Sequence, residues 1–64
     1  MMPANDLRLN QTVYWQDPAT HATRRGRIAG YNAFHYFVEV RPDFVVYRER
    51  EHLATEEEWA ERWR

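Results

Sequence analysis

Short runs of β-branched and aromatic residues, each bounded by turn-forming residues, constrain the fold of this chain more than any other feature. The clearest run is His35–Arg41, where Tyr36, Val38 and Val40 alternate with residues expected to face outward. Alternation with a period of two is typical of a strand with one buried face. Three further segments have strand character: Leu7–Asp17, Arg24–Tyr31 and Phe44–Arg50. The pattern predicts a mainly β domain of four to five short antiparallel strands.

Turn residues and two glycines indicate how these strands are arranged. Asp17-Pro18 ends the first strand, and Pro42-Asp43 favours a tight turn between the third and the fourth. Gly26 and Gly30 fall on one face of the second strand, which predicts a bent strand or a close backbone approach. Together these features favour a small closed barrel, because closure removes exposed strand edges.

The segment 55–64 carries the signature of a short C-terminal helix. Thr55 and Glu58 have the spacing of a capping box, and acidic residues gather at the start of the helix, as its dipole favours. So short a helix is unstable in water by itself. Trp59 and Trp63 lie one turn apart, so we expect them to anchor it on the barrel or on another chain.

The chain has 64 residues, enough for one domain, with a leader over 1–6, a barrel over 11–53 and the helix. It contains no cysteine, which excludes disulfides and thiolate metal sites. It also lacks an apolar run long enough to span a bilayer and the pattern of a secretory signal. The sequence therefore predicts a cytoplasmic protein without a membrane partner.

Three segments carry a resemblance to a known fold: 26–31, 36–39 and 45–47. They resemble, in order, the middle of an SH3-like small barrel of the Tudor or KOW kind. The pattern is also similar to that of plasmid-encoded type II dihydrofolate reductase. That family is a homotetramer of SH3-like barrels, in which folate and NADPH meet in a central pore. The resemblance covers roughly residues 11–53 and implies an SH3-like barrel.

The functional residues of that reductase family are not matched in this chain. The pore-lining Gln-Ile-Tyr triplet of the family falls on Val45, Val46 and Tyr47, which removes the glutamine. The family's ligand-binding lysine falls near Trp15, and this chain has no lysine. The resemblance thus implies the fold and argues against the activity. A reductase-like pore protein is kept as a distant alternative.

Residues suited to catalysis or metal binding are scarce. The chain has no serine or cysteine, so the usual nucleophiles are missing. His21, His35 and His52 lack the spacing of a metal site. We therefore predict a protein that is not an enzyme and that binds no metal or cofactor.

Aromatic residues support the main functional prediction. Three Trp, four Tyr and three Phe are many for so short a chain, and Trp and Tyr often dominate binding at protein interfaces. The predicted function is a non-catalytic interaction module that binds a protein partner, or itself as a homo-oligomer. Its aromatic surface is predicted to include the following residues: Tyr14, Tyr47, Trp59 and Trp63.

The alternative function is nucleic-acid binding. Arg24, Arg25 and Arg27 could contact phosphates while Tyr31 stacks on a base. The formal net charge of −1 and the acidic run 56–58 speak against this alternative, because both weaken attraction to a phosphate backbone.

Overall fold

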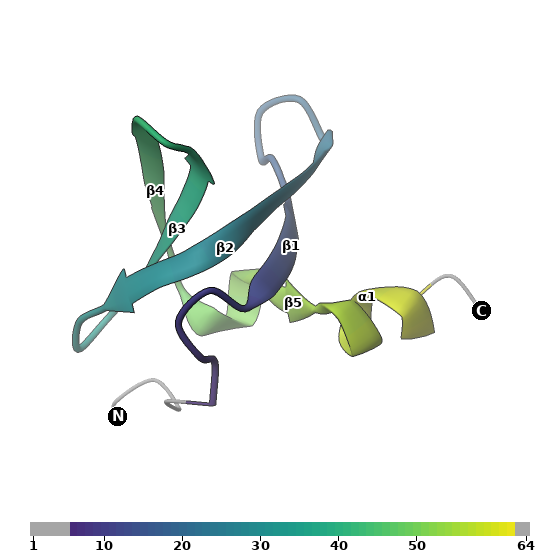
Figure 1. The fold of residues 1–64 in the computed structure, drawn as a ribbon. Helices are drawn as coiled ribbons and strands as arrows, with labels where there is room; N and C mark the ends of the chain where they lie inside the picture. The colour runs from purple at the N-terminus through teal and green to yellow at the C-terminus, as the bar shows by residue number, and fades with distance from the viewer. Residues whose placement is uncertain (1–5, 63–64) are drawn as a thin grey trace.

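The computed structural model describes residues 6–62, which form one antiparallel sheet followed by a short helix (Figure 1). The strands are β1 (Thr12–Gln16), β2 (Thr23–Tyr31), β3 (Tyr36–Arg41), β4 (Phe44–Arg48) and β5 (Ala54–Thr55). A 3-10 helix, η1 (Arg50–His52), connects β4 to β5, and the α-helix α1 (Glu56–Glu61) follows β5 directly. The prediction of a mainly β fold with a short C-terminal helix is confirmed.

The strand order in the sheet is β4-β3-β2-β1-β5, so β4 and β5 are its two edges. The long strand β2 takes part in both hairpins, pairing with β1 and with β3 (Figure 1). The chain passes from one edge strand to the other through η1 alone. The sheet extends beyond the predicted boundary at residue 53, because β5 pairs with β1.

The core lies on the face of the sheet that the alternation predicted to be inward. Its buried residues are Leu7, Val13, Trp15, Ile28, Tyr36, Val38 and Leu53. Leu7 is only 4% exposed, and the Asn10 backbone N–H donates to the Ile28 carbonyl at 2.7 Å. The residues just before β1 therefore contribute to the core. Of the predicted leader, residues 1–5 lie outside the described part of the chain.

Gly26 confirms the predicted close approach of backbone and side chains. A Cβ atom at this position would lie 2.7 Å from Val38 Cγ1, 2.8 Å from the Glu39 carbonyl oxygen and 3.3 Å from Trp15 Cη2. These distances leave no room for a side chain. Glycine at position 26 thus allows β2, β3 and the Trp15 ring to pack together.

Two register shifts change which side chains share a face. In β2 the shift lies between Ile28 and Gly30, so Gly30 is opposite Phe37 and Tyr31 is opposite Tyr36. Strict alternation predicts that Gly30 shares the face of Gly26 and that Tyr31 shares the face of Arg25 and Arg27, and both assignments are wrong. An extra residue in one strand reverses the faces of all residues that follow it.

The second shift lies in β3, between Glu39 and Arg41. A regular two-residue hairpin over Pro42-Asp43 would pair Val38 with Tyr47 and turn Tyr47 inward. The shift instead pairs Phe37 with Tyr47 and Val38 with Val46. Val46 is accordingly half-buried, and Tyr47 is exposed.

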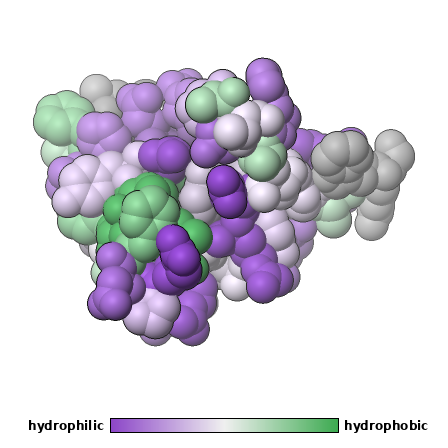
Figure 2. Space-filling model, turned by 90° about the horizontal axis from the view of Figure 1, so that it is seen from above, coloured by the Kyte–Doolittle hydropathy of each residue, from purple (hydrophilic) through white to green (hydrophobic). Residues whose placement is uncertain are grey.

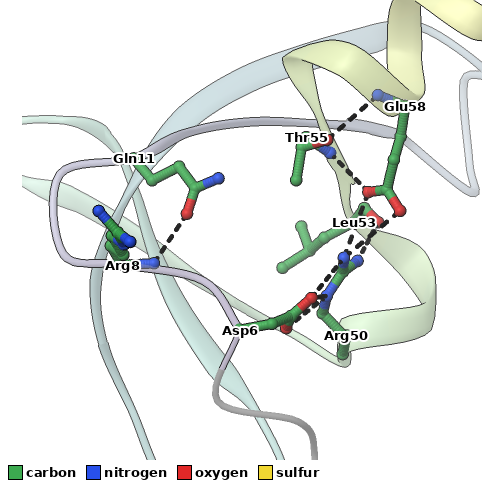
Figure 3. Close-up of polar contacts among 7 residues, drawn as sticks. All are labelled: Asp6, Arg8, Gln11, Arg50, Leu53, Thr55 and Glu58. Atoms are coloured by element: carbon green, nitrogen blue, oxygen red, sulfur yellow. Dashed lines mark hydrogen bonds and ion pairs between the residues drawn. The ribbon is translucent and has the colours of Figure 1, made fainter.

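Arg50 connects segments that are distant in sequence (Figure 3). Its Nε lies 3.0 Å from Asp6 Oδ1, one Nη lies 3.2 Å from Glu58 Oε1, and the other donates to the Leu53 carbonyl at 2.8 Å. Asp6 precedes Arg50 by 44 residues. One guanidinium group therefore joins the N-terminal segment, η1 and the first turn of α1.

The capping box at the start of α1 is confirmed. The Glu58 N–H donates to Thr55 Oγ1, and the Thr55 N–H donates to Glu58 Oε1. Within residues 6–62 the helix covers six residues. The last two residues of the predicted range, including Trp63, lie outside the described residues. None of the helices in residues 6–62 has the length and apolar character needed to cross a membrane.

Candidate interaction surface

An exposed apolar cluster lies on the outward face of β3 and β4. The Phe37 and Tyr47 rings, paired across the two strands, have centroids 4.8 Å apart and planes inclined by 37°. Val45 lies two residues before Tyr47 and so shares its face. Tyr47 is 60% exposed and Val45 is 44% exposed, whereas Phe37 is half-buried. We call Phe37, Val45 and Tyr47 the β3–β4 patch.

The position of β4 makes this patch accessible along the free edge of the sheet as well as from its outward face. β4 is an edge strand, so within residues 6–62 one side of its backbone pairs with no other strand. Edge strands with apolar side chains are common sites of pairing with another chain. Of the other exposed large apolar residues, Leu9 and Phe34 lie in loops, whereas Tyr31 ends β2 and Phe44 begins β4.

The structure divides the four aromatic residues that were predicted to form one surface. Tyr14 of β1 and Trp59 of α1 are stacked, with centroids 5.7 Å apart and planes inclined by 12°. Arg62 lies over the Trp59 ring at 5.3 Å. Trp59 therefore anchors the helix on its own sheet. Tyr47 belongs to the β3–β4 patch, and Trp63 is outside the described residues.

The structure also divides the predicted nucleic-acid face. Arg24 is opposite Trp15 and has the orientation of Gly26 and Ile28, whereas Arg25 and Arg27 point to the other side of β2. Arg27 lies 3.8 Å from Glu39. Beyond the register shift, the Tyr31 ring contacts Tyr36 at 5.9 Å. The four residues thus do not share one surface.

One group of potential metal ligands was not predicted from the sequence. His52 Nε2 lies 3.6 Å from a carboxylate oxygen of Glu49 and 3.6 Å from one of Glu51. All three residues are exposed, and their ligand atoms lie within 4.8 Å of one another. Exposed His–carboxylate contacts of this kind are ordinary surface ion pairs when His is protonated.

The sequence places Phe37 outward but does not reveal that it contacts Tyr47. That contact depends on the register shift in β3, and no residue type between Glu39 and Arg41 marks such a shift. The alternation of Val45, Val46 and Tyr47 shows only that the first and third share a face. The sequence therefore shows which residues of each strand share a face, but it does not show which residues of β3 and β4 are paired.

Comparison of the chain with known protein families, curated proteins and solved structures finds no match. The geometry of residues 6–62 is therefore the basis for the function proposed below.

Proposed function

We propose that this protein is a non-catalytic interaction module that binds another protein chain, its own copy or a different protein, through the β3–β4 patch. The observation that carries the proposal is the pair formed by the exposed Tyr47 ring and the half-buried Phe37 ring on an edge hairpin, with the exposed Val45 beside it. Single exposed apolar residues are normal on protein surfaces. Adjacent exposed aromatic and aliphatic residues on paired strands more often mark an interface.

The energetics of such a surface favour protein binding. Aromatic residues bury a large area with few rotatable bonds, so they lose little conformational entropy on binding. The free side of β4 can add backbone hydrogen bonds to a second strand. The strand order, with its edges connected through η1, supports an SH3-like barrel as the framework for this patch.

Site-specific photo-crosslinking tests the proposal. The variant Tyr47→p-benzoylphenylalanine, expressed in cells of the source organism and irradiated, should form a covalent adduct with one protein of defined mass. Glu51→p-benzoylphenylalanine is the matched control, because Glu51 is exposed on η1, outside the patch. Sedimentation of the purified chain then shows whether the adduct is with a second copy.

The expected result is an adduct at position 47 that is absent at position 51. If the chain is its own partner, the purified protein should sediment as an oligomer, and Tyr47→Ser should shift it toward monomer. A monomeric chain whose position 47 forms no more adduct than position 51 would overturn the proposal.

A further inference from the structure

A second surface lies at the end of the molecule that carries the β3–β4 hairpin and the β1–β2 loop. Figure 2 looks onto this end and shows a strongly apolar area surrounded by hydrophilic side chains. A groove of about 490 Å³ lies there. Its apolar lining comes from four residues: Trp15, Val40, Phe44 and Val46.

The charges around this groove are predominantly positive. Arg24, Arg41 and Arg48 line it together with a single acidic residue, Asp17. This local excess contrasts with the net charge of −1 for the whole chain. The three arginines come from three different strands, β2, β3 and β4. The sequence alone does not show that they lie close together, because only the pairing of the strands brings them to one groove.

Two of the three arginines are held close to aromatic rings. The guanidinium carbon of Arg48 lies 5.8 Å from the centroid of Trp15, and that of Arg41 lies 5.7 Å from the centroid of Phe44. Both distances are in the range of cation–π contacts. Such contacts orient the guanidinium groups. One Arg48 Nη donates to the Tyr47 carbonyl at 2.8 Å, and the other N–H donors of the two side chains remain available for a carboxylate.

Within residues 6–62 the Asp17 carboxylate makes no hydrogen bond or ion pair with these arginines and serves the β1–β2 loop instead. Its Oδ1 accepts from the backbone N–H groups of Ala19 at 2.8 Å and Thr20 at 3.1 Å. These hydrogen bonds, helped by the nearby charges of Arg24 and Arg48, lower the pKa of Asp17. The acid is thus a fixed part of the loop.

Trp15 contributes a further observation. The residue is only 3% exposed, and its Nε1–H has no hydrogen-bond acceptor within residues 6–62. Buried donors without an acceptor are rare in proteins and call for an explanation. Trp15 is at the same time a lining residue of the basic groove.

We infer that this groove binds an acidic peptide segment of a partner protein, in which an apolar side chain is flanked by carboxylates. The apolar side chain packs on Val40, Phe44 and Val46, and the carboxylates pair with Arg24, Arg41 and Arg48. Burial of an arginine–carboxylate pair beside an apolar anchor is typical of strong contacts at protein interfaces. The inference is independent of the proposed function, since Tyr47 and Val45 point to the opposite face of β4.

A peptide fits the groove better than a nucleic acid does. The groove combines an apolar floor with three cations in a confined volume, which suits one side chain and its acidic neighbours. A nucleic acid backbone would need a longer positive track, and the net charge of the chain gives no such field.

Selection from a random peptide library tests the inference on the full chain. A library of phage-displayed dodecapeptides is panned on the immobilised protein, and enriched peptides are synthesised with a fluorescent label for polarisation measurements. The enriched peptides should contain Asp or Glu next to an apolar residue. Their affinity should fall about tenfold in Arg24→Gln, the loss expected for one charged hydrogen bond, and should decrease with salt.

Arg25→Gln is the matched control, because it removes the same charge from the neighbouring residue on the other face of β2. Its affinity should stay within about twofold of the original chain, and melting curves confirm that both variants fold. Failure to enrich any peptide, enrichment of peptides without acidic residues, or equal losses in the two variants would each overturn the inference. Binding of oligo(dT) that is weakened selectively by Arg24→Gln would assign the groove to nucleic acid and would overturn it as well.

Discussion

At the scale of single residues, Gly26 is the position where the fold tolerates change least. Gly26 is buried, and it has no positive φ, so the requirement is for space and not for an unusual backbone conformation. In Gly26→Ala the new methyl group would collide with the Glu39 carbonyl oxygen, which belongs to the backbone and cannot rotate away. We expect a destabilisation of about 1–3 kcal/mol, measured as a lower melting temperature by circular dichroism.

Gly30→Ala is the control for this prediction. A Cβ atom at position 30 would lie 3.1 Å from the Phe37 ring, which is a side chain and can shift. Replacing glycine with alanine also restricts the unfolded chain, which offsets part of the cost. We therefore expect Gly30→Ala to melt well above Gly26→Ala. Equal melting temperatures for the two variants would contradict the steric argument.

The side-chain faces of β1 and β3 were predictable from alternation, because Val13, Trp15, Tyr36 and Val38 are all apolar and all buried. The register shifts were not predictable. The position of a bulge depends on backbone twist and on the packing of neighbouring strands, so the types of the residues that form it indicate it only weakly. This is why the position of Tyr31 was predicted incorrectly and the Phe37–Tyr47 contact was not predicted at all.

At the scale of elements, α1 depends on the sheet for its stability. A helix of six residues is too short to persist alone, although its capping box is complete. Its aromatic contact with the sheet is the Tyr14–Trp59 stack. A double-mutant cycle of Tyr14→Ala and Trp59→Ala should therefore show a coupling of about 0.5–1.5 kcal/mol, measured by urea unfolding.

Glu57→Ala serves as the control for the cycle, since Glu57 is exposed on the same helix. Combined with Tyr14→Ala, it should give additive changes in the free energy of unfolding. Additivity between Tyr14→Ala and Trp59→Ala would contradict the stack. The cap was predictable because it involves residues three positions apart, whereas the choice of Tyr14 as the partner of Trp59 depends on β5 pairing with β1.

At the scale of the whole molecule, Arg50 links parts of the chain that no local pattern connects. The sequence shows an acidic helix start and a scattered set of arginines, but not which arginine reaches it. The contacts with Asp6 and Glu58 arise only when the N-terminal segment, η1 and the start of α1 are brought together in the fold (Figure 3). The same holds for Arg24, Arg41 and Arg48, which the sheet gathers around one groove.

The contacts of Arg50 with Asp6 and Glu58 make the free energy of unfolding depend on pH. Hydrogen bonds from Arg50 lower the pKa of Asp6 below its ordinary 3.8. The Thr55 backbone N–H, followed by Arg50, lowers the pKa of Glu58 below its ordinary 4.5. The folded chain therefore binds fewer protons than the unfolded chain in acid. The stabilisation is fully present above these ordinary values and is lost as the pH falls through the lowered ones.

Asp6→Asn tests this linkage directly. Because Asp6 is about half exposed, its ion pair with Arg50 should contribute less than about 1 kcal/mol at neutral pH. The variant should be less stable than the original chain at about pH 7, and the difference should shrink as the pH is lowered to about 2, because the carboxylate is then increasingly protonated in both states. Urea unfolding at the two pH values measures this difference.

Introducing Asp6→Asn into the Arg50→Met variant separates the loss of the ion pair from other effects of Asp6→Asn. Without the guanidinium group, Asp6→Asn removes no ion pair, so it should change the free energy of unfolding little at either pH. A loss of stability that is equal at the two pH values in the original background would mean that the Asp6 contact acts through hydrogen bonding alone. A loss that persists in Arg50→Met would mean that Asp6 stabilises the N-terminal segment without Arg50. Only a loss that requires both the arginine and the ionised carboxylate identifies the Asp6–Arg50 ion pair as the contact that ties the N-terminal segment to η1.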